Sequence, residues 1–151
     1  YEVCGGSYNC AIHDRMSADG VDWGNPADLG RQITAANGQY FLHTPTIAWS
    51  PGAGPHGQLV LVGQLLYNAD GSVAANNGGA VMVSHNGPGG PWSVIPAPVA
   101  VANPYDNYCP NYSSSLLPLA GGTRLLEIAT AYDSDQVCKA FFGTGSVPPQ
   151  R

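Results

Sequence analysis

The chain has 151 residues, of which 10% are charged and 44% are hydrophobic, and its formal net charge is −5. With only five Lys and Arg residues, it lacks the clustered cations that bind phosphates, which argues against a nucleic-acid partner and an anionic membrane surface. No apolar run approaches the roughly 18 residues that a membrane span needs.

The 20 glycines and 13 prolines favour turns over helices, and the apolar runs between them predict short strands. In chain order these are Ala11–Met16, Val21–Trp23, Phe41–Trp49, Gln58–Tyr67, Ala80–Ser84, Trp92–Ile95, Ser114–Leu119, Arg124–Ala131 and Lys139–Gly143. The run Gln58–Tyr67 is so apolar that we expect it to be buried on both faces. Many short strands of this kind predict an all-β sandwich, barrel or propeller.

A short pattern occurs twice after a predicted strand. Ser17-Ala18-Asp19-Gly20 is followed by Trp23, and Ser84-His85-Asn86-Gly87 is followed, after a longer turn, by Trp92. The Asp or Asn side chain can accept hydrogen bonds from backbone N–H groups, Gly allows a positive φ, and Trp can pack the hairpin onto its sheet. The pattern resembles the Asp box of sialidase-like β-propellers, with a shortened first copy and an Asn in the second.

The resemblance implies part of a β-propeller built of four-stranded antiparallel blades, about two and a quarter of them in residues 1–151. The blade segments are roughly 1–39, 40–104 and 105–151, with two, four and three strands. Since a closed propeller needs at least about four blades, we expect the partner to be the remainder of the propeller or, less favoured, further copies of the chain.

In this family, substrate binds on the face opposite the Asp boxes. The loops of that face would carry His43, Tyr67, Asn68, Tyr105, Tyr108, Tyr112 and Tyr132. Aromatic rings stack on the CH groups of sugar rings, and amides hydrogen-bond hydroxyls, so carbohydrate is the expected partner. Loops are commonly rich in these residue types, and that simpler interpretation stays open.

Glu127 lies inside an apolar strand, where a carboxylate is costly without a partner. Burial there would raise its pKa and suit it to general-acid catalysis. A glycosidase needs two carboxyl groups, and Asp106 or Asp133 could be the second. Alternatively, Glu127 faces outward into solvent or pairs with an arginine.

Sialidases clamp their substrate with three arginines, and no spacing among the four arginines here, Arg15, Arg31, Arg124 and Arg151, identifies such a triad. The resemblance therefore fits exo-arabinanase-like relatives or sugar-binding propellers equally well. We expect an exo-acting glycoside hydrolase, and the alternatives are a non-catalytic, lectin-like propeller or an extracellular structural module that assembles through blade edges.

The four cysteines are Cys4, Cys10, Cys109 and Cys138. An even number fits an oxidising compartment, so we expect a secreted protein. Three pairings are possible, and we favour Cys4–Cys10, whose loop contains two glycines, together with Cys109–Cys138, which would join neighbouring strands. The start of the chain lacks signal-peptide features, so a secreted form would be mature or trimmed.

Asn111-Tyr112-Ser113 is a glycosylation triplet and mildly supports secretion. The absence of a Cys-x-x-Cys spacing argues against zinc. The stretch Asn68–Ser72 has one carboxylate and is better explained as an Asp-Gly turn than as a calcium loop. We therefore expect no metal and no cofactor.

Overall fold

The computed structural model describes residues 1–5, 10–77, 79–96, 115–132 and 138–147. Within these ranges every regular element is a strand, so the all-β expectation is confirmed. The strands are β1 (Glu2–Cys4), β2 (Cys10–Asp14), β3 (Arg31–Gln32), β4 (Tyr40–Leu42), β5 (Thr46–Ser50), β6 (Gln58–Val62), β7 (Leu65–Tyr67), β8 (Ala80–Ser84), β9 (Ser93–Pro96), β10 (Ser115–Pro118), β11 (Arg124–Tyr132) and β12 (Cys138–Ser146). Among the described residues no helix is long and apolar enough to cross a membrane.

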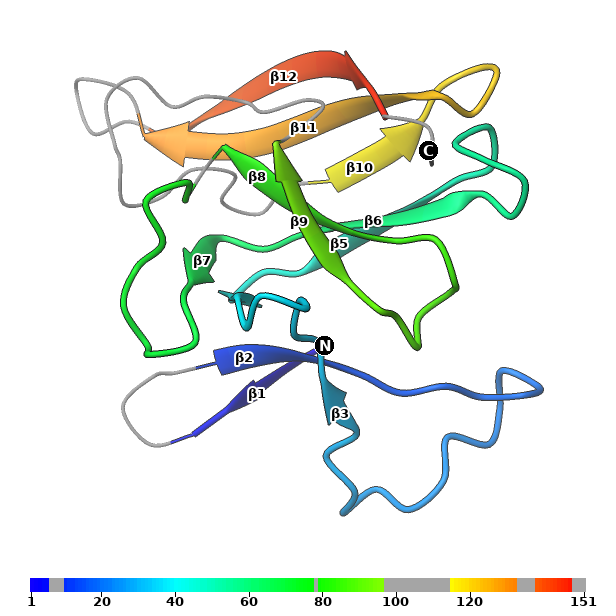
Figure 1. Cartoon of the computed structure of the whole chain (residues 1–151), viewed down its shortest axis with the longest axis vertical. Coiled ribbons are helices and arrows are strands. Elements are labelled where there is room, and N and C mark those ends of the chain that lie inside the picture. Colours follow the sequence, from blue (N-terminus) through cyan, green and yellow to red (C-terminus); the bar gives the residue numbers. More distant parts are fainter. Residues whose placement is uncertain (6–9, 78, 97–114, 133–137, 148–151) are drawn as a thin grey trace.

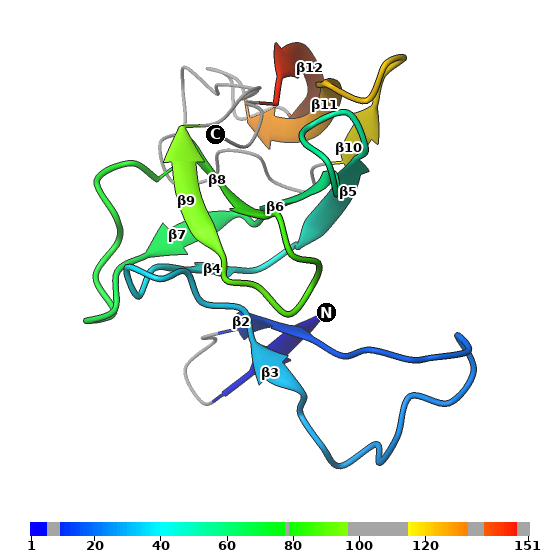
Figure 2. The ribbon, with the colours of Figure 1, turned by 45° about the vertical axis from the view of Figure 1, so that its right-hand side comes forward.

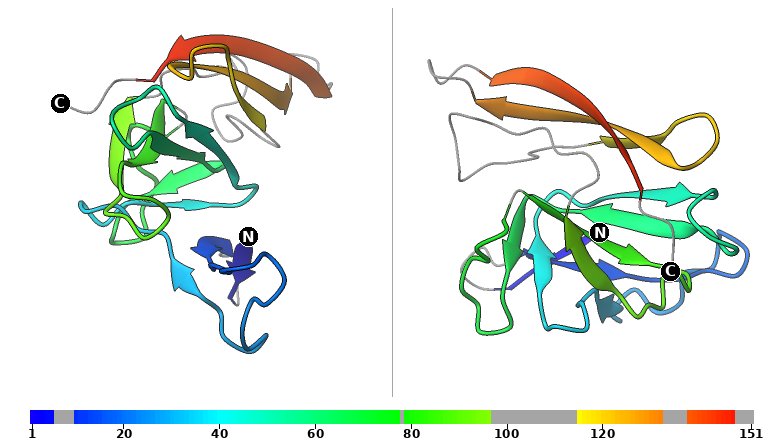
Figure 3. Two further views of the ribbon diagram at one scale, coloured as in Figure 1. Left: turned by 90° about the vertical axis from the view of Figure 1, so that its right-hand side faces the viewer. Right: turned by 45° about the horizontal axis from the view of Figure 1, so that its top comes forward.

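The strands form three antiparallel sheets. The first sheet has the order β1-β2-β4-β7, with β3 also paired to β2; the second is β5-β6-β8-β9, and the third is β10-β11-β12. Figures 1 and 3 show them stacked, with the third sheet at the top, the second in the middle and the first below. The sequence predicted blade segments of two, four and three strands, and the described residues form sheets of five, four and three strands.

The second sheet forms the centre of the molecule. All five residues of β8 are buried, and in β6 only Leu59 is partly exposed. One hydrophobic cluster runs through all three sheets, from Ile12 through Val60 and Met82 to Leu125. The expected burial on both faces is therefore confirmed for β6, and this shared apolar core holds the sheets together.

Two strands that the sequence predicted to be continuous are each divided in the structure, so these two predictions are wrong. Phe41–Trp49 is divided into β4 and β5, and Gln58–Tyr67 is divided into β6 and β7. In both cases one part belongs to the first sheet and the other to the second. The segment 40–104 therefore contributes strands to two sheets.

Local geometry explains both breaks. His43 and Thr44 have positive φ angles of 58° and 42°, which interrupt a strand. Across from them, a Cβ on Gly63 would lie 2.7 Å from Phe41 Cβ and 2.8 Å from Ile12 Cδ1. Only glycine allows the first sheet to approach the backbone this closely.

The partner of β2 in the structure is not the expected one. Val21–Trp23 forms no strand, and β3 pairs with β2 instead, with Asp14 opposite Arg31. Arg31 Nη2 lies 2.6 Å from Asp14 Oδ2, and the same guanidinium donates to Pro88 O and Gly89 O, each at 2.7 Å. These contacts of the Arg31 guanidinium favour β3, not Val21–Trp23, as the strand that pairs with β2.

The third sheet agrees with the expected strands, although β12 extends beyond Lys139–Gly143 in both directions. Its face toward the second sheet carries the buried Leu116 and Leu125. Its other face leaves Leu117, Ile128 and Phe142 exposed, with Phe142 at 80%. An apolar surface of this kind marks a contact site.

The Cys4–Cys10 disulfide is confirmed, and it joins directly opposite residues of β1 and β2. Cys109 and the glycosylation triplet at Asn111 lie outside the described residues, as does the side chain of Cys138. The pairing Cys109–Cys138 and the glycosylation of Asn111 therefore stay predictions.

Trp92 provides a test of the core. It is 3% exposed, and its Nε1–H donates to Pro88 O at 3.0 Å. We expect Trp92→Ala to lower the free energy of unfolding by about 3–5 kcal/mol, because a large buried aromatic is removed. Urea unfolding followed by circular dichroism measures the loss. The control Trp23→Ala removes a tryptophan that is 50% exposed and should cost less than about 1 kcal/mol; equal losses would contradict this assignment of the core.

Candidate functional site

Glu127 lies in the middle of β11 and is 1% exposed. It shares a face of the strand with Leu125 and Ala129, both buried, and lies opposite Leu116 of β10 and Gly143 of β12. The alternation expected from the sequence is therefore correct, and the alternative of a solvated, outward-facing Glu127 is wrong. The structure holds a carboxyl group within an apolar face, away from bulk water.

The strand that carries Glu127 is held firmly in place. β11 pairs with β10 from Leu125 to Ile128 and with β12 along its whole length. The third sheet is also tied to the second, because the hydroxyl of Ser50 and the N–H of Gly52 both donate to Gly122 O. A functional group on paired strands is positioned more precisely than one on a loop.

Most of the other predicted site residues lie where the structure gives no placement. Tyr132 ends β11, and its side chain is not described. The residues outside the described ranges are Tyr105, Asp106, Tyr108, Tyr112 and Asp133. Their roles stay predictions.

The described members of the predicted substrate face do not come together. Tyr67 lies opposite Tyr40 at one end of the β4–β7 pair, with ring centroids 6.1 Å apart. His43 follows the other end of β4, where its Nδ1 is 3.6 Å from Glu2 Oε2. His43 and Tyr67 therefore lie at opposite ends of the same pair of strands.

Asn68 has a structural role. Its Oδ1 accepts from Gln39 Nε2 at 2.9 Å, and its Nδ2 donates to Ser72 Oγ at 3.1 Å. The backbone N–H of Asn68 also donates to Ser72 O at 2.8 Å. These bonds close the turn after β7 and fix the amide that was expected to contact sugar.

The turn chemistry of the Asp-box resemblance is present in the first copy. Asp19 Oδ1 accepts the backbone N–H groups of Val21 and Asp22, each at 2.8 Å, and the hydroxyl of Ser17 at 2.9 Å. The expectation that Trp23 packs the hairpin onto its sheet is wrong, since half of Trp23 is exposed. In the second copy Trp92 is buried as expected.

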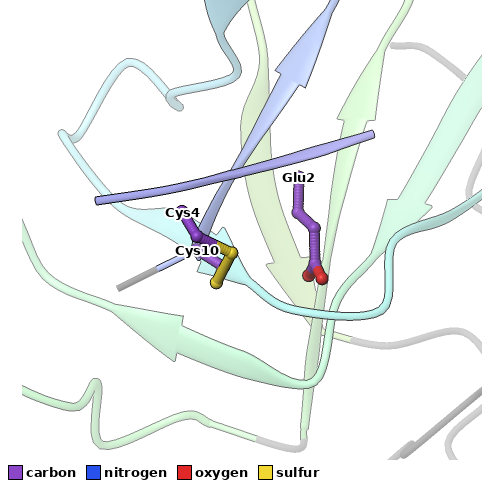
Figure 4. Close-up of side chains that lie close together, drawn as sticks. All are labelled: Glu2, Cys4 and Cys10. Atoms are coloured by element: carbon purple, nitrogen blue, oxygen red, sulfur yellow. A yellow bond between two sulfur atoms is a disulfide. The ribbon is translucent and has the colours of Figure 1, made fainter. Parts of the chain in front are cut away.

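Three possible metal-ligand atoms lie within 4.8 Å of one another at Glu2, Cys4 and Cys10. Figure 4 shows the Glu2 carboxylate beside the bonded sulfurs. Because sulfur binds metals as a thiolate, the disulfide removes two of the three ligands. Glu2 has another contact: its Oε2 accepts the backbone N–H of Thr44 at 3.2 Å.

Two adjoining hollows beside the loop from β2 to β3 were not predicted. One is about 320 Å³ in volume and the other about 300 Å³, and Tyr1 and Arg15 line both. The sequence signals near them are the polar triplet His13–Arg15 and a tryptophan in a loop rich in Asp and Gly. Neither signal predicts a hollow, because the hollow exists only once the β2–β3 loop has folded.

No protein-family model and no curated protein matches the chain. Two solved structures do. An α-L-arabinanase of Penicillium chrysogenum, complexed with arabinobiose, aligns with 93% of this chain and 34% of its own at a TM-score of 0.62 and 16% identity. An α-L-arabinofuranosidase of Fusarium graminearum, bound to an iminosugar inhibitor, aligns with 92% of this chain and 37% of its own at a TM-score of 0.56 and 14% identity.

The chain folds as part of a β-propeller. The four-stranded second sheet is a complete blade, and the chain spans about a third of the length of the two enzymes. At this level of identity the comparisons establish the fold. They extend the expected resemblance to propeller glycoside hydrolases in general and do not single out the Asp-box sialidases.

Asp19 gives a test of the first Asp-box-like turn. The N–H groups of Asp22 and Val21, followed by the hydroxyl of Ser17, hold the pKa of Asp19 below its ordinary value of 3.8. The stability from these bonds is therefore present above pH 3.8 and is lost as the pH falls through the lower, folded-state pKa. Carboxyl-carbon NMR shifts measured against pH should show the low pKa, and Ser17→Ala should raise it.

The control for that titration is Asp70, whose pKa is lowered by the hydroxyl and N–H of Ser72. Ser17→Ala should leave the pKa of Asp70 unchanged, because no hydrogen bond among the described residues joins the two turns. An Asp19 that titrates at 3.8 or above in the folded protein would show that the turn does not form in solution.

Proposed function

We propose that the chain is a segment of a secreted, carbohydrate-active propeller enzyme, an exo-acting glycoside hydrolase in which Glu127 is the general acid. The observation that carries the proposal is a carboxyl group buried on a paired strand of a propeller. The fold likeness to an α-L-arabinanase and an α-L-arabinofuranosidase supports a neutral glycan as the proposed substrate class. The Cys4–Cys10 disulfide supports an oxidising, extracellular location.

The chemistry needs a proton at the leaving oxygen of the glycosidic bond. A carboxylic acid held away from bulk water can supply it, and a second carboxyl group on the other side of the bond acts as the base or the nucleophile. Asp106 and Asp133 are the proposed second groups. A separation of about 5–5.5 Å from Glu127 would indicate a retaining enzyme, and about 6.5–9.5 Å an inverting one.

Substrate contacts are proposed for four tyrosines that lie close in sequence to the strands of the third sheet. Tyr132 closes β11 five residues beyond Glu127. Tyr105, Tyr108 and Tyr112 precede β10 in the sequence. Tyrosine rings can stack on sugar rings while their hydroxyls bond the ring substituents, so these residues would hold the glycan beside the acid.

The exposed face of the third sheet supports a further part of the proposal, the packing of another blade against it. Besides the exposed Ile128 and Phe142, the face has a shallow cavity of about 170 Å³, lined by Leu126, Ile128, Ala140, Phe141 and Phe142. Blades of a propeller pack face to face, so we assign this face to the remainder of the propeller, with a second copy of the chain as the alternative occupant.

Glu127→Gln tests the catalytic assignment. Gln keeps the shape of the side chain but cannot donate the acid proton, so turnover of aryl glycosides should fall by about 10²–10⁴-fold. Circular dichroism checks that the fold is kept. The matched control is Asp70→Asn in the exposed turn after β7, which should turn over at the wild-type rate.

Equal rates for Glu127→Gln and wild type would remove Glu127 from the mechanism. A wild-type protein that binds glycans but cleaves none of them would favour the lectin-like alternative. Binding without cleavage would leave the propeller fold intact and would overturn only the enzymatic assignment.

Phe142→Asp tests the apolar face. The chain of 151 residues is expected to associate in solution, because Phe142 and its apolar neighbours favour leaving water. A charge at this position should reduce the association that light scattering measures. The control is Val21→Asp, at a site that is 82% exposed in a loop, which should change nothing. A wild-type chain that stays monomeric would contradict the proposal.

A further inference from the structure

The loop between β2 and β3 borders an open hollow of about 320 Å³, lined by Tyr1, Arg15, Trp23, Pro26, Asp28 and Leu29. Figure 2 shows this loop extending away from the stacked sheets at the lower right. Trp23 is 50% exposed, and Tyr1 and Leu29 are also exposed. Large apolar side chains that gather around one hollow and stay open to water mark a binding site.

The walls of the hollow are held by side-chain hydrogen bonds to the backbone. Arg15 Nη2 donates to Asn25 O at 2.7 Å, and the Tyr1 hydroxyl donates to Leu29 O at 2.7 Å. Three carbonyl or carboxylate side chains each accept a backbone N–H two residues ahead: Asp22 from Gly24, Asn25 from Ala27 and Asp28 from Gly30. A wall fixed in advance loses little conformational freedom when a ligand binds.

The polar groups of the hollow are a donor and an acceptor placed side by side. Arg15 Nη2 lies 4.0 Å from Asp28 Oδ2, and the Asp28 side chain is exposed. Arginine carries five N–H donors and a carboxylate carries several lone pairs. Such a pair can bond adjacent hydroxyls on a ring whose apolar side rests on Trp23.

The charge of the surrounding segment selects the ligand class. Residues 14–31 contain four aspartates, Asp14, Asp19, Asp22 and Asp28, and two arginines, Arg15 and Arg31. The excess of negative charge disfavours phosphates and uronic acids, which need clustered cations. The Arg15 guanidinium within the hollow disfavours organic cations. A neutral ring with hydroxyls and an apolar side meets both conditions.

The second hollow, of about 300 Å³, continues the first across Tyr1 and Arg15. It reaches between the first and second sheets, where its lining includes His13, Thr46 and Ile47. Two adjoining hollows of this size, each at the small end of the range for ligand pockets, suit successive rings of one chain.

We propose that these two hollows bind a neutral saccharide chain, with the ring in the first hollow stacked on Trp23 and bonded by Arg15 and Asp28. The site lies at the β2–β3 loop and extends between the first and second sheets. Glu127 lies on the third sheet, with the second sheet between them (Figure 1). The proposed site is therefore separate from the catalytic one.

The probe is arabinobiose, titrated into the 151-residue chain up to about 10 mM, with tryptophan fluorescence and NMR amide shifts as readouts. Amides of the loop 15–30 should shift on binding. Trp23→Ala should weaken binding at least about tenfold, since stacking on an aromatic ring is lost. Asp28→Ala should weaken it less.

The matched control is Trp49→Ala, which removes a tryptophan of similar exposure, 44%, that lines neither hollow. It should bind as the wild type does, and so should Glu127→Gln, so this test is independent of the catalytic one. Urea unfolding of each variant checks the fold. The proposal is overturned by equal affinity in Trp23→Ala and wild type, by an absence of binding, or by stronger binding of digalacturonate than of arabinobiose.

Discussion

The division of one long hairpin between two sheets is the constraint on which the rest of the structure depends. β5 and β6 pair in the second sheet, and β4 and β7 continue the same two chain segments into the first. The change occurs where His43 and Thr44 take positive φ angles and where Gly63 lets the first sheet approach. A non-glycine residue in the left-handed region costs about 1–3 kcal/mol, so contacts such as Thr44 N–H to Glu2 must offset it.

Hydrogen bonds at the turns then join the neighbouring sheets. Arg31 of the first sheet reaches the carbonyls of Pro88 and Gly89 in the turn before Trp92. At the other side of the second sheet, Gly122 O accepts from Ser50 and Gly52. Apolar burial supplies a non-directional attraction between the sheets, while these polar contacts fix their order and orientation. The buried position of Glu127 and the hollows beside Arg15 both follow from that arrangement.

The sequence predicted correctly those features that depend only on residues close together in the chain. β8 and β11 are largely apolar runs without Gly or Pro. The disulfide closes a short loop, and alternation along β11 placed Glu127 on the buried face. Features that depend on contacts between residues far apart in the sequence could not be predicted from the sequence pattern. The exchange of Val21–Trp23 for β3 depends on Arg31, whose acceptors lie far away in the sequence. The hollow around Trp23 depends on how the 15–30 loop folds back, and turn motifs alone do not specify that.

The two proposed sites place different demands on the fold, and the propeller meets both. A proton donor must be held rigidly and away from water, which a paired strand such as β11 in a close-packed core provides. A recognition surface must be open to a polymer, which the loop carrying Trp23 provides. Because the second sheet separates the two proposed sites, a sugar ring held at Trp23 would belong to a different part of the polymer from the bond cleaved at the proposed acid, Glu127, or to a neighbouring polymer chain. Holding it there would raise the effective concentration of chain ends at the acid without any change in the chemistry.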